Sequence, residues 1–272
     1  MEGKPMMSET ANPHLVHTER FTAEAERVAT LLESLGTDDW GRPAPSCPGW
    51  NVRKVARHIG TAHRWAAAIV RSPGQEAVNP RSLDLGFPES YAGYGDWVRA
   101  GAAELAYAVR EAGPDKPVWS WGPDQHARFW ARRMLHETAM HRGDMVLALG
   151  QTPQFDPAVA ADGIDEFLTV LPAAAAFAPK IRALTGDGET LHLHATDGDP
   201  AAVGEERAEW LITLEPHGFR WRRAHAKGAA AVRGPVGELY LFVWGRRAPG
   251  AKEIEALGDH TLLDHWVRNA SF

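Results

Sequence analysis

Cysteine is almost absent from this sequence: Cys47 is the only one among 272 residues. A single cysteine excludes an internal disulfide and favours a reducing compartment, so we expect a cytoplasmic protein. The opening residues, MEGKPMMSETANPH, lack the apolar core of a signal peptide, and we expect the first dozen to be disordered. No apolar run is long enough to cross a bilayer, so we expect no membrane partner.

Excess positive charge is also missing, because the formal net charge is -6. This balance gives no sign of a nucleic-acid partner. The chain does have ample apolar material. Hydrophobic residues make up 44% of it, enough for a sizeable core in one large domain or two smaller ones.

The first two thirds of the chain show helical periodicity, with apolar residues three and four apart. Breaks occur at Gly36, between Pro43 and Pro48, after Ser72 and at Gly113, where Gly and Pro stop helices. Four such segments followed by a fifth predict a four-helix bundle with one added helix. The segments are HTERFTAEAERVATLLESLG, WNVRKVARHIGTAHRWAAAIVRS, SYAGYGDWVRAGAAELAYAVREAG, DQHARFWARRMLHETAMHRGDMVLALG and DPAVAADGIDEFLTVLPAAAAFAPKIRAL.

The last third changes to alternating periodicity. TLHLHATD, EWLITLE and GFRWRRAH predict strands of a small antiparallel sheet. GPVGELYLFVWGRR returns to helical spacing, and HTLLDHWVRN predicts a short final helix. We therefore expect an α+β chain, with a helical bundle domain at residues 14–184 and a small α+β domain at residues 185–272.

The segment RRMLHETAMHRGDM contains HETAMH, which is close to the zinc-protease signature H-E-x-x-H. The protease motif needs its histidines four apart, whereas His136 and His141 are five apart. On a helix these two differ by about 140° and cannot share a metal, while Glu137 and His141 differ by about 40° and share a face. The sequence therefore predicts that Glu137 and His141, and not His136, are the two side chains of this segment that can act together at one site.

Two interpretations of this helix face remain open. Burying unpaired charge is expensive, so acids and histidines in a core either pair or bind metal. A buried salt-bridge network, Glu137 with Arg133 and Asp144 with Arg142, is one interpretation. A metal site is the other, and it needs a ligand from another helix.

The second helical segment offers two histidines for that ligand, His58 and His63. Both lie on or beside an apolar stripe of VARHIGTAHRW, so periodicity does not choose between them. A lone histidine in such a place is more often a core or boundary side chain than a ligand.

Several stretches resemble one known family. CPGWNVRKVARHIGTAHRW and RRMLHETAMHRGDM resemble the bundle domain of the mycothiol-dependent maleylpyruvate isomerase family, a branch of the DinB-type four-helix metalloproteins. LHLHATDG, VRGPVGELYLFVWGRR and EALGD resemble the smaller domain of that family, in the same order. The resemblance implies a DinB-like four-helix bundle followed by a small α+β domain.

Carried over residue by residue, the resemblance implies His58, Glu137 and His141 as metal ligands. It leaves His63 and His136 outside the ligand set. Two imidazoles and one carboxylate with an open fourth position are typical of a catalytic zinc site.

The resemblance also implies the chemistry. The resembling enzymes use mycothiol, a small thiol, and a bound metal removes the thiol proton to give a nucleophilic thiolate. Addition of this thiolate to maleylpyruvate, bond rotation and elimination convert the cis to the trans isomer. The same thiolate attacking another electrophile gives S-transfer. We therefore expect an enzyme that uses zinc, or another divalent metal, and mycothiol on a small electrophilic substrate.

Two other functions are alternatives. A metal hydrolase would use a metal-bound hydroxide directly and would need no thiol. A non-catalytic member of the same fold would act as a metal-binding or regulatory module.

Other residues receive secondary roles. Arg246 is the candidate for binding a carboxylate of thiol or substrate across the interdomain cleft, with a solvated helix end as the alternative. Asp144 either orients a ligand histidine or forms a structural salt bridge. We interpret Cys47 as a packed loop residue, because no activating base is visible beside it, and Trp50 as a core anchor.

Overall fold

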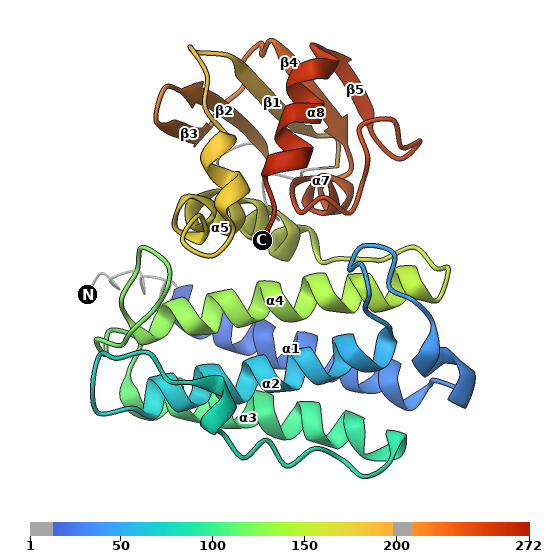
Figure 1. Cartoon of the computed structure of the whole chain (residues 1–272), viewed down its shortest axis with the longest axis vertical. Coiled ribbons are helices and arrows are strands. Elements are labelled where there is room, and N and C mark those ends of the chain that lie inside the picture. The colour runs from blue at the N-terminus through green and yellow to red at the C-terminus, as the bar shows by residue number, and fades with distance from the viewer. Residues whose placement is uncertain (1–12, 198–207) are drawn as a thin grey trace, which may run out of the picture.

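A computed structural model describes residues 13–197 and 208–272 of the chain. Figure 1 shows two layers, a bundle of long helices and, above it, a twisted sheet with shorter helices. The expected disorder of the first dozen residues lies outside the described part of the chain. No helix in that part is both long and apolar enough to cross a membrane.

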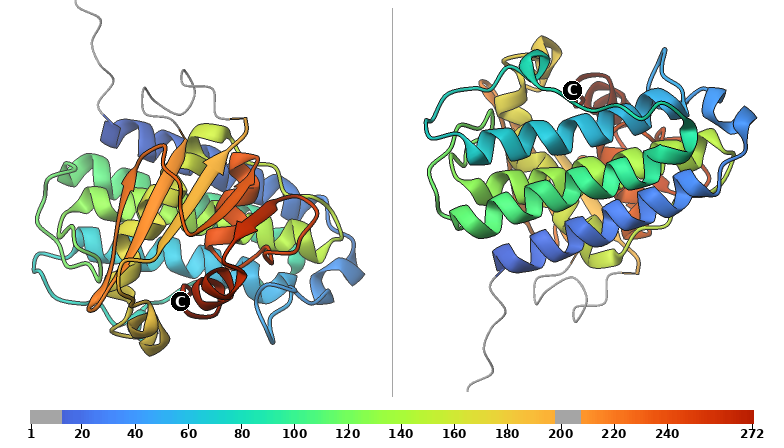
Figure 2. Two further views of the ribbon diagram at one scale, coloured as in Figure 1. Left: turned by 90° about the horizontal axis from the view of Figure 1, so that it is seen from above. Right: turned by 90° about the horizontal axis from the view of Figure 1, so that it is seen from below.

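Four long helices make the bundle, as the sequence predicts. α1 and α2 each pack against both α3 and α4, and Figure 2 (right) shows this layer from below. Short 3-10 turns lie in the loops, at Thr37–Gly41, Pro80–Ser82 and Tyr91–Gly93. The four helices are α1 (Pro13–Glu33), α2 (Val52–Arg71), α3 (Tyr94–Ala112) and α4 (Ala127–Ala148).

Local chemistry fixes the start and the packing of α2. The side chain of Asn51 caps this helix by accepting a hydrogen bond from the backbone of Lys54 at 3.0 Å. A Cβ atom at Gly60 would lie 2.1 Å from the ring of Trp97 on α3. Glycine therefore lets these two helices pack closely.

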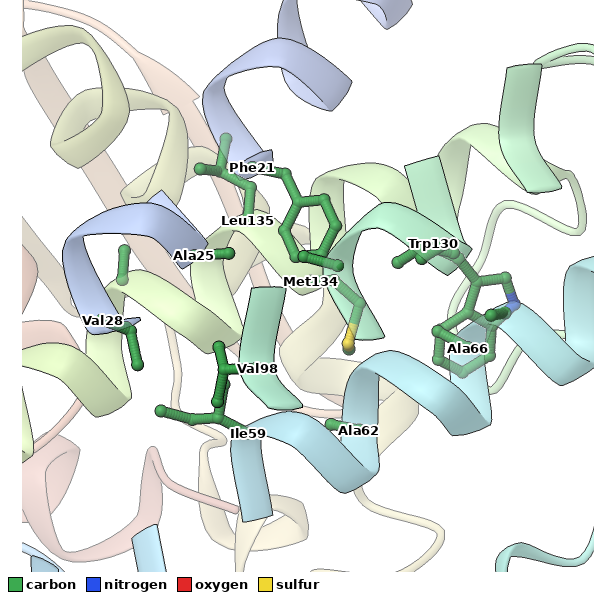
Figure 3. Packing of buried hydrophobic residues seen from close by; sticks show 14 of the residues in the cluster. Phe21, Ala25, Val28, Ile59, Ala62, Ala66, Val98, Trp130, Met134 and Leu135 are labelled. Carbon is green, nitrogen blue, oxygen red and sulfur yellow. The ribbon is translucent and has the colours of Figure 1, made fainter. Parts of the chain in front are cut away.

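The bundle core is made of side chains from all four helices. Phe21, Ile59, Val98 and Trp130 are fully buried and belong to one cluster (Figure 3). The indole nitrogen of Trp130 donates to the backbone oxygen of Trp119 at 2.9 Å, so the one polar atom of this side chain is satisfied.

The upper layer is a five-stranded sheet in the order β3-β2-β1-β4-β5. The three predicted strands are confirmed as β1 to β3, and the predicted helices as α7 and α8. Figure 2 (left) shows the sheet from above, on the side away from the bundle. The strands are β1 (Thr190–Ala195), β2 (Glu209–Glu215), β3 (Gly218–Arg223), β4 (Ala230–Gly234) and β5 (Glu255–Gly258).

One strand pair departs from the antiparallel prediction, because β1 and β4 are parallel. β3 runs in the same direction as β1, since both are antiparallel to β2. The chain then returns through residues 224–229 and starts β4 beside Leu191, at the beginning of β1. We call residues 224–229 the crossover segment. β4 and β5 are short, at five and four residues, and were not predicted.

A second core joins the sheet to its helices, α5 (Pro157–Ala174), α7 (Val236–Val243) and α8 (His260–Asn269), and to the 3-10 turn Pro179–Ala183. α5 packs mainly against α7, and both lie between the sheet and the bundle in Figure 1. The buried residues of α5 thus belong to the core of the upper layer. The predicted domain boundary between residues 184 and 185 stays a prediction.

Candidate active site

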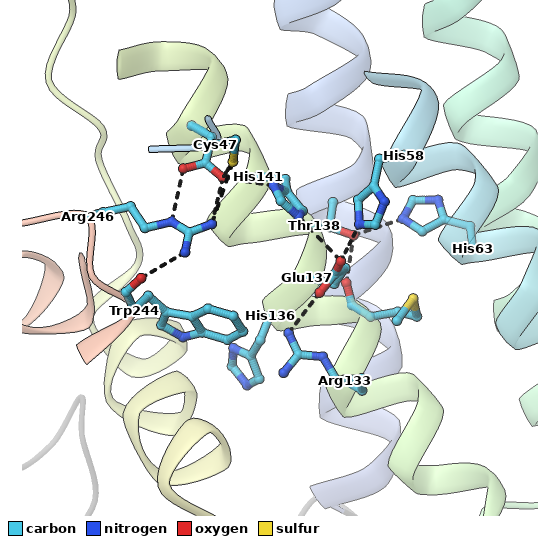
Figure 4. Close-up of polar contacts among 12 residues, drawn as sticks. Cys47, His58, His63, Arg133, His136, Glu137, Thr138, His141, Trp244 and Arg246 are labelled. Atoms are coloured by element: carbon cyan, nitrogen blue, oxygen red, sulfur yellow. Dashed lines mark hydrogen bonds and ion pairs between the residues drawn. The ribbon is translucent and has the colours of Figure 1, made fainter. Parts of the chain in front are cut away.

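α2 and α4 bring His58, Glu137 and His141 together (Figure 4). Nε2 of His58 lies 2.6 Å from Oε1 of Glu137, and Nε2 of His141 lies 3.4 Å from the same oxygen. The ligand atoms of the three side chains are all within 4.8 Å of one another. We call these three residues the α2–α4 cluster.

Arg133 fixes the orientation of Glu137. Its Nη2 donates to Oε2 of Glu137 at 3.1 Å, while its Nη1 donates to Glu166 of α5 at 2.6 Å. Arg133 and Glu166 are almost completely buried. The expected pair of Glu137 with Arg133 therefore exists, but it occupies one carboxylate oxygen and leaves Oε1 to the two imidazoles.

Asp144 fixes the ring of His141. Its Oδ2 lies 2.8 Å from Nδ1 of His141, so that Nε2 is the nitrogen left facing Glu137. Arg246, which follows α7, donates to both oxygens of Asp144, from Nε at 3.1 Å and Nη2 at 3.0 Å. Asp144 is fully buried, so this bidentate pair compensates its charge.

The alternative pair of Asp144 with Arg142 is wrong. Arg142 points away from the cluster and forms a bidentate pair with Glu24 of α1, at 3.0 and 3.1 Å. The helix face alone could not show this, because Glu24 and Arg246 come from distant parts of the chain.

The protonation of the cluster follows from its contacts. Burial alone would raise the pKa of Glu137, but hydrogen bonds with His141 and His58 hold that pKa well below its usual value. Burial alone would lower the pKa of His141, but hydrogen bonds with Asp144, Cys47 and Glu137 raise it well above its usual value. Binding of a cation by this cluster would therefore release a proton from His141.

The two histidines left out of the ligand set lie elsewhere. Nε2 of His63 is 2.8 Å from the hydroxyl of Thr138, and burial lowers the pKa of His63 to about 3. Nε2 of His136 is 2.7 Å from Oδ2 of Asp162 on α5. Each has a partner of its own, buried Thr138 for His63 and half-buried Asp162 for His136, and neither joins the α2–α4 cluster.

The cluster lies in the wall of a cavity of about 1230 Å³. Trp50 stacks on His141, with ring centroids 6.0 Å apart, and meets His58 edge-on at 5.0 Å. The expected core anchor therefore faces the site. Further aromatic side chains from both layers line the cavity, among them Trp65, Trp119, Trp121, Trp244 and Phe272.

Cys47 also lines this cavity, which corrects its interpretation as a packed loop residue only. Its sulfur lies 3.2 Å from Oδ2 of Asp144, and its side chain hydrogen-bonds with His141. With these two residues it forms a second group whose ligand atoms lie within 4.8 Å of one another. The sequence showed no base beside Cys47 because its partners come from a helix far along the chain.

Two family models match the sequence. The mycothiol maleylpyruvate isomerase N-terminal domain matches residues 21–146, and the MDMPI C-terminal domain matches residues 158–265. The chain belongs to the mycothiol-dependent maleylpyruvate isomerase family. The family resemblance seen in the sequence is therefore confirmed, together with the α+β fold of bundle and small sheet domain.

Solved structures agree on the fold of this family. A crystal structure of the mycothiol-dependent maleylpyruvate isomerase is 16% identical, with a TM-score of 0.52, and the match covers 90% of this chain and 91% of that chain. The structure of a histidine-to-alanine mutant of that enzyme gives the same values. No curated protein sequence is similar enough to count as a match.

Proposed function

We propose that this chain is a metal-dependent enzyme that uses mycothiol to act on a small electrophilic substrate. The reaction is isomerisation of the maleylpyruvate type or transfer of the thiol to the substrate. One observation carries the proposal: a cluster of two imidazoles and one carboxylate opens onto a cavity that exceeds the range of about 300–1,000 Å³ typical of a single small ligand. Such a cavity has room for a thiol and a substrate together.

The α2–α4 cluster suits a divalent metal such as zinc. Neutral imidazole and carboxylate are the ligands of catalytic zinc sites, in which three protein ligands leave one position open. The side chain of His58 is 36% exposed, so the cluster can be reached from the cavity. We propose His58, Glu137 and His141 as the metal ligands.

The side chains around the cluster support this assignment. Arg133 holds one oxygen of Glu137, and Asp144 holds Nδ1 of His141. These are the hydrogen bonds by which proteins orient metal ligands. A bound metal would supply the charge that deprotonates a thiol, and mycothiol would supply the nucleophilic sulfur.

Arg246 is the proposed binding residue for a carboxylate of thiol or substrate. Four of the five N–H donors of a guanidinium are occupied here, by Asp144, the backbone oxygen of Trp244 and the sulfur of Cys47. Arg246 thus has one donor to offer a ligand, and its larger role is to hold Asp144 in place. Lys180, also on the cavity wall, adds a positive charge that favours anionic substrates.

The test is metal analysis followed by an assay with and without thiol. We expect about one zinc or comparable divalent ion bound at the α2–α4 cluster, and product formation from maleylpyruvate or a related electrophile only when mycothiol is present. Equal rates without mycothiol would favour the hydrolase alternative. Protein that binds no metal at the cluster would exclude both enzymes and favour a non-catalytic role.

A further inference from the structure

The outer face of the sheet carries a second group of histidines, away from the cavity. His192 and His194 are two residues apart on β1, so both side chains point to the same face of the sheet. Leu191 and Leu193 point to the opposite face and are buried in the core of the upper layer. His192 nevertheless is buried, which requires a cover on the outer face.

The crossover segment provides that cover. It leaves the end of β3, where the backbone of Ala224 donates to the oxygen of Glu209 at 3.1 Å, and returns across β1 to the start of β4. A Cβ atom at Gly228 would lie 3.0 Å from the backbone nitrogen of His192, so glycine allows the crossover segment to pass this close to β1. The backbone of Ala224 also hydrogen-bonds with the ring of His192 and orients it.

Three imidazoles converge on one carboxylate oxygen at this place. Glu209 is the β2 partner of His194, and its Oε2 lies 3.1 Å from Nδ1 of His194 and 3.0 Å from Nε2 of His192. His225, from the crossover segment, brings its Nδ1 to 2.7 Å from the same oxygen. The centroids of the three rings are 6.0 to 6.4 Å apart.

Hydrogen bonding does not account for this arrangement. One carboxylate oxygen has two lone pairs, yet three ring nitrogens surround it. Nε2 of His192 is buried and close to Oε2 of Glu209, but it is not aligned for a hydrogen bond with any described residue. A buried imidazole nitrogen without a hydrogen bond, aimed at a carboxylate, calls for an explanation, and a shared cation is one that also accounts for the other two rings.

We propose that His192, His194, His225 and Glu209 form a second metal site for a divalent transition-metal ion such as zinc. Three nitrogens and one oxygen are a donor set that zinc accepts. Metal–ligand bonds of about 2.0–2.2 Å in a tetrahedron place ligand atoms about 3.3 Å apart. The nitrogen–oxygen distances here, 2.7 to 3.1 Å, would open by about 0.2–0.6 Å. The ligand atoms of His192, His194 and Glu209 already lie within 4.8 Å of one another, and the largely exposed ring of His225 would turn toward them to complete the set.

The site differs from the α2–α4 cluster in its role. Four protein ligands close the coordination sphere, which is the pattern of structural zinc. The ion would tie the crossover segment to β1 and β2. This role is independent of the proposed catalytic activity.

Zinc titration of the full chain, with any affinity tag removed, tests the proposal in a His141→Ala background that lacks a ligand of the α2–α4 cluster. We expect this variant to bind one zinc ion and to melt at a higher temperature when zinc is added. Adding His225→Ala should weaken zinc binding by about 100-fold or more and abolish the thermal shift. Such a loss exceeds the 10–100-fold typical of removing a residue that only hydrogen-bonds to a metal ligand. Because the His225 side chain is 66% exposed, the fold should persist.

The matched control is His217→Ala in the same background, which removes an exposed histidine from the turn between β2 and β3. It should leave zinc affinity unchanged. The proposal is overturned if His141→Ala binds no zinc, or if the His225→Ala and His217→Ala double variants bind it equally. If instead the α2–α4 cluster binds no metal and this second site does, wild-type protein and His141→Ala would both bind one zinc ion, which distinguishes the two proposals.

Discussion

His136 and His141 are five residues apart on α4 and have opposite surroundings. His136 is fully buried and pairs with Asp162 of α5 at 2.7 Å. His141 faces the cavity, beside Glu137 and Trp50. Both rings are held by an aspartate, so their contacts with acids do not distinguish them. What distinguishes them is that only His141 lines the cavity and contacts Glu137.

We therefore predict a split between metal binding and stability for these two histidines. His141→Ala should remove the metal from the α2–α4 cluster, because it deletes a ligand. His136→Ala should leave that metal bound but lower the free energy of unfolding by about 1–3 kcal/mol, because Asp162 loses a buried partner. Metal content and urea denaturation of both variants check this. Equal metal loss in His136→Ala would exclude our assignment of the helix face.

The sequence predicts some of these residues and not others, for a physical reason. Glu137 and His141 follow from one helix angle, a local property. His58 follows only from the family resemblance, because His63 lies on an equally apolar stripe. Cys47 and Arg246 meet at Asp144 from positions 97 and 102 residues away, and no local pattern encodes such contacts.

Long elements were easier to predict than short ones. Each helix of the bundle spans about five to six turns, so its periodicity repeats and predicts it clearly. β4 offers only AAVRG, in which three buried residues alternate with one half-buried and one exposed residue. Its parallel pairing with β1 depends on the crossover segment, which is defined by packing across the sheet and not by periodicity.

The close packing of α2 on α3 gives a prediction at this scale. Gly60→Ala should lower the free energy of unfolding by about 1–3 kcal/mol, because the added methyl group overlaps the ring of Trp97. Helix propensity alone would favour alanine by about 1 kcal/mol. Urea denaturation measures which effect dominates.

Gly237→Ala, in α7, is the matched control. There a Cβ atom would lie 3.5 Å from Phe155, an ordinary contact, so this variant should be neutral or slightly stabilised. A Gly60→Ala protein as stable as Gly237→Ala would show that α2 and α3 move apart without cost.

On the scale of the whole molecule, buried ion pairs connect the two layers around the cluster. Arg133 of α4 pairs with Glu166 of α5, and Arg246 of the upper layer pairs with Asp144 of α4. Arg133 also contacts Glu137, and Asp144 also contacts His141, so each pair is one contact away from a proposed ligand. The position of the upper layer thus determines how the proposed ligands are oriented.

This coupling predicts that a residue of the small domain controls metal affinity in the bundle. Arg246→Ala leaves the buried charge of Asp144 without its bidentate partner, so the ring of His141 loses a fixed support. We expect metal affinity at the cluster to fall by about 10–100-fold, the usual effect of losing a residue that orients a ligand. Competition with a chelator, in the metal-loaded full chain, measures this loss.

Arg247→Ala is the comparison that separates positioning from stability. Arg247 is the next residue, and it forms a similarly buried pair with Glu238 of α7, away from the α2–α4 cluster. Removing one partner of a buried ion pair lowers the free energy of unfolding by up to about 3–5 kcal/mol, because the other charge stays buried and unpaired. Both variants lose such a pair. Only Arg246→Ala should also change the metal affinity. If both variants bind metal equally well, the link from Arg246 through Asp144 to His141 has no influence on the metal, and the two layers share a cavity wall but not a metal centre.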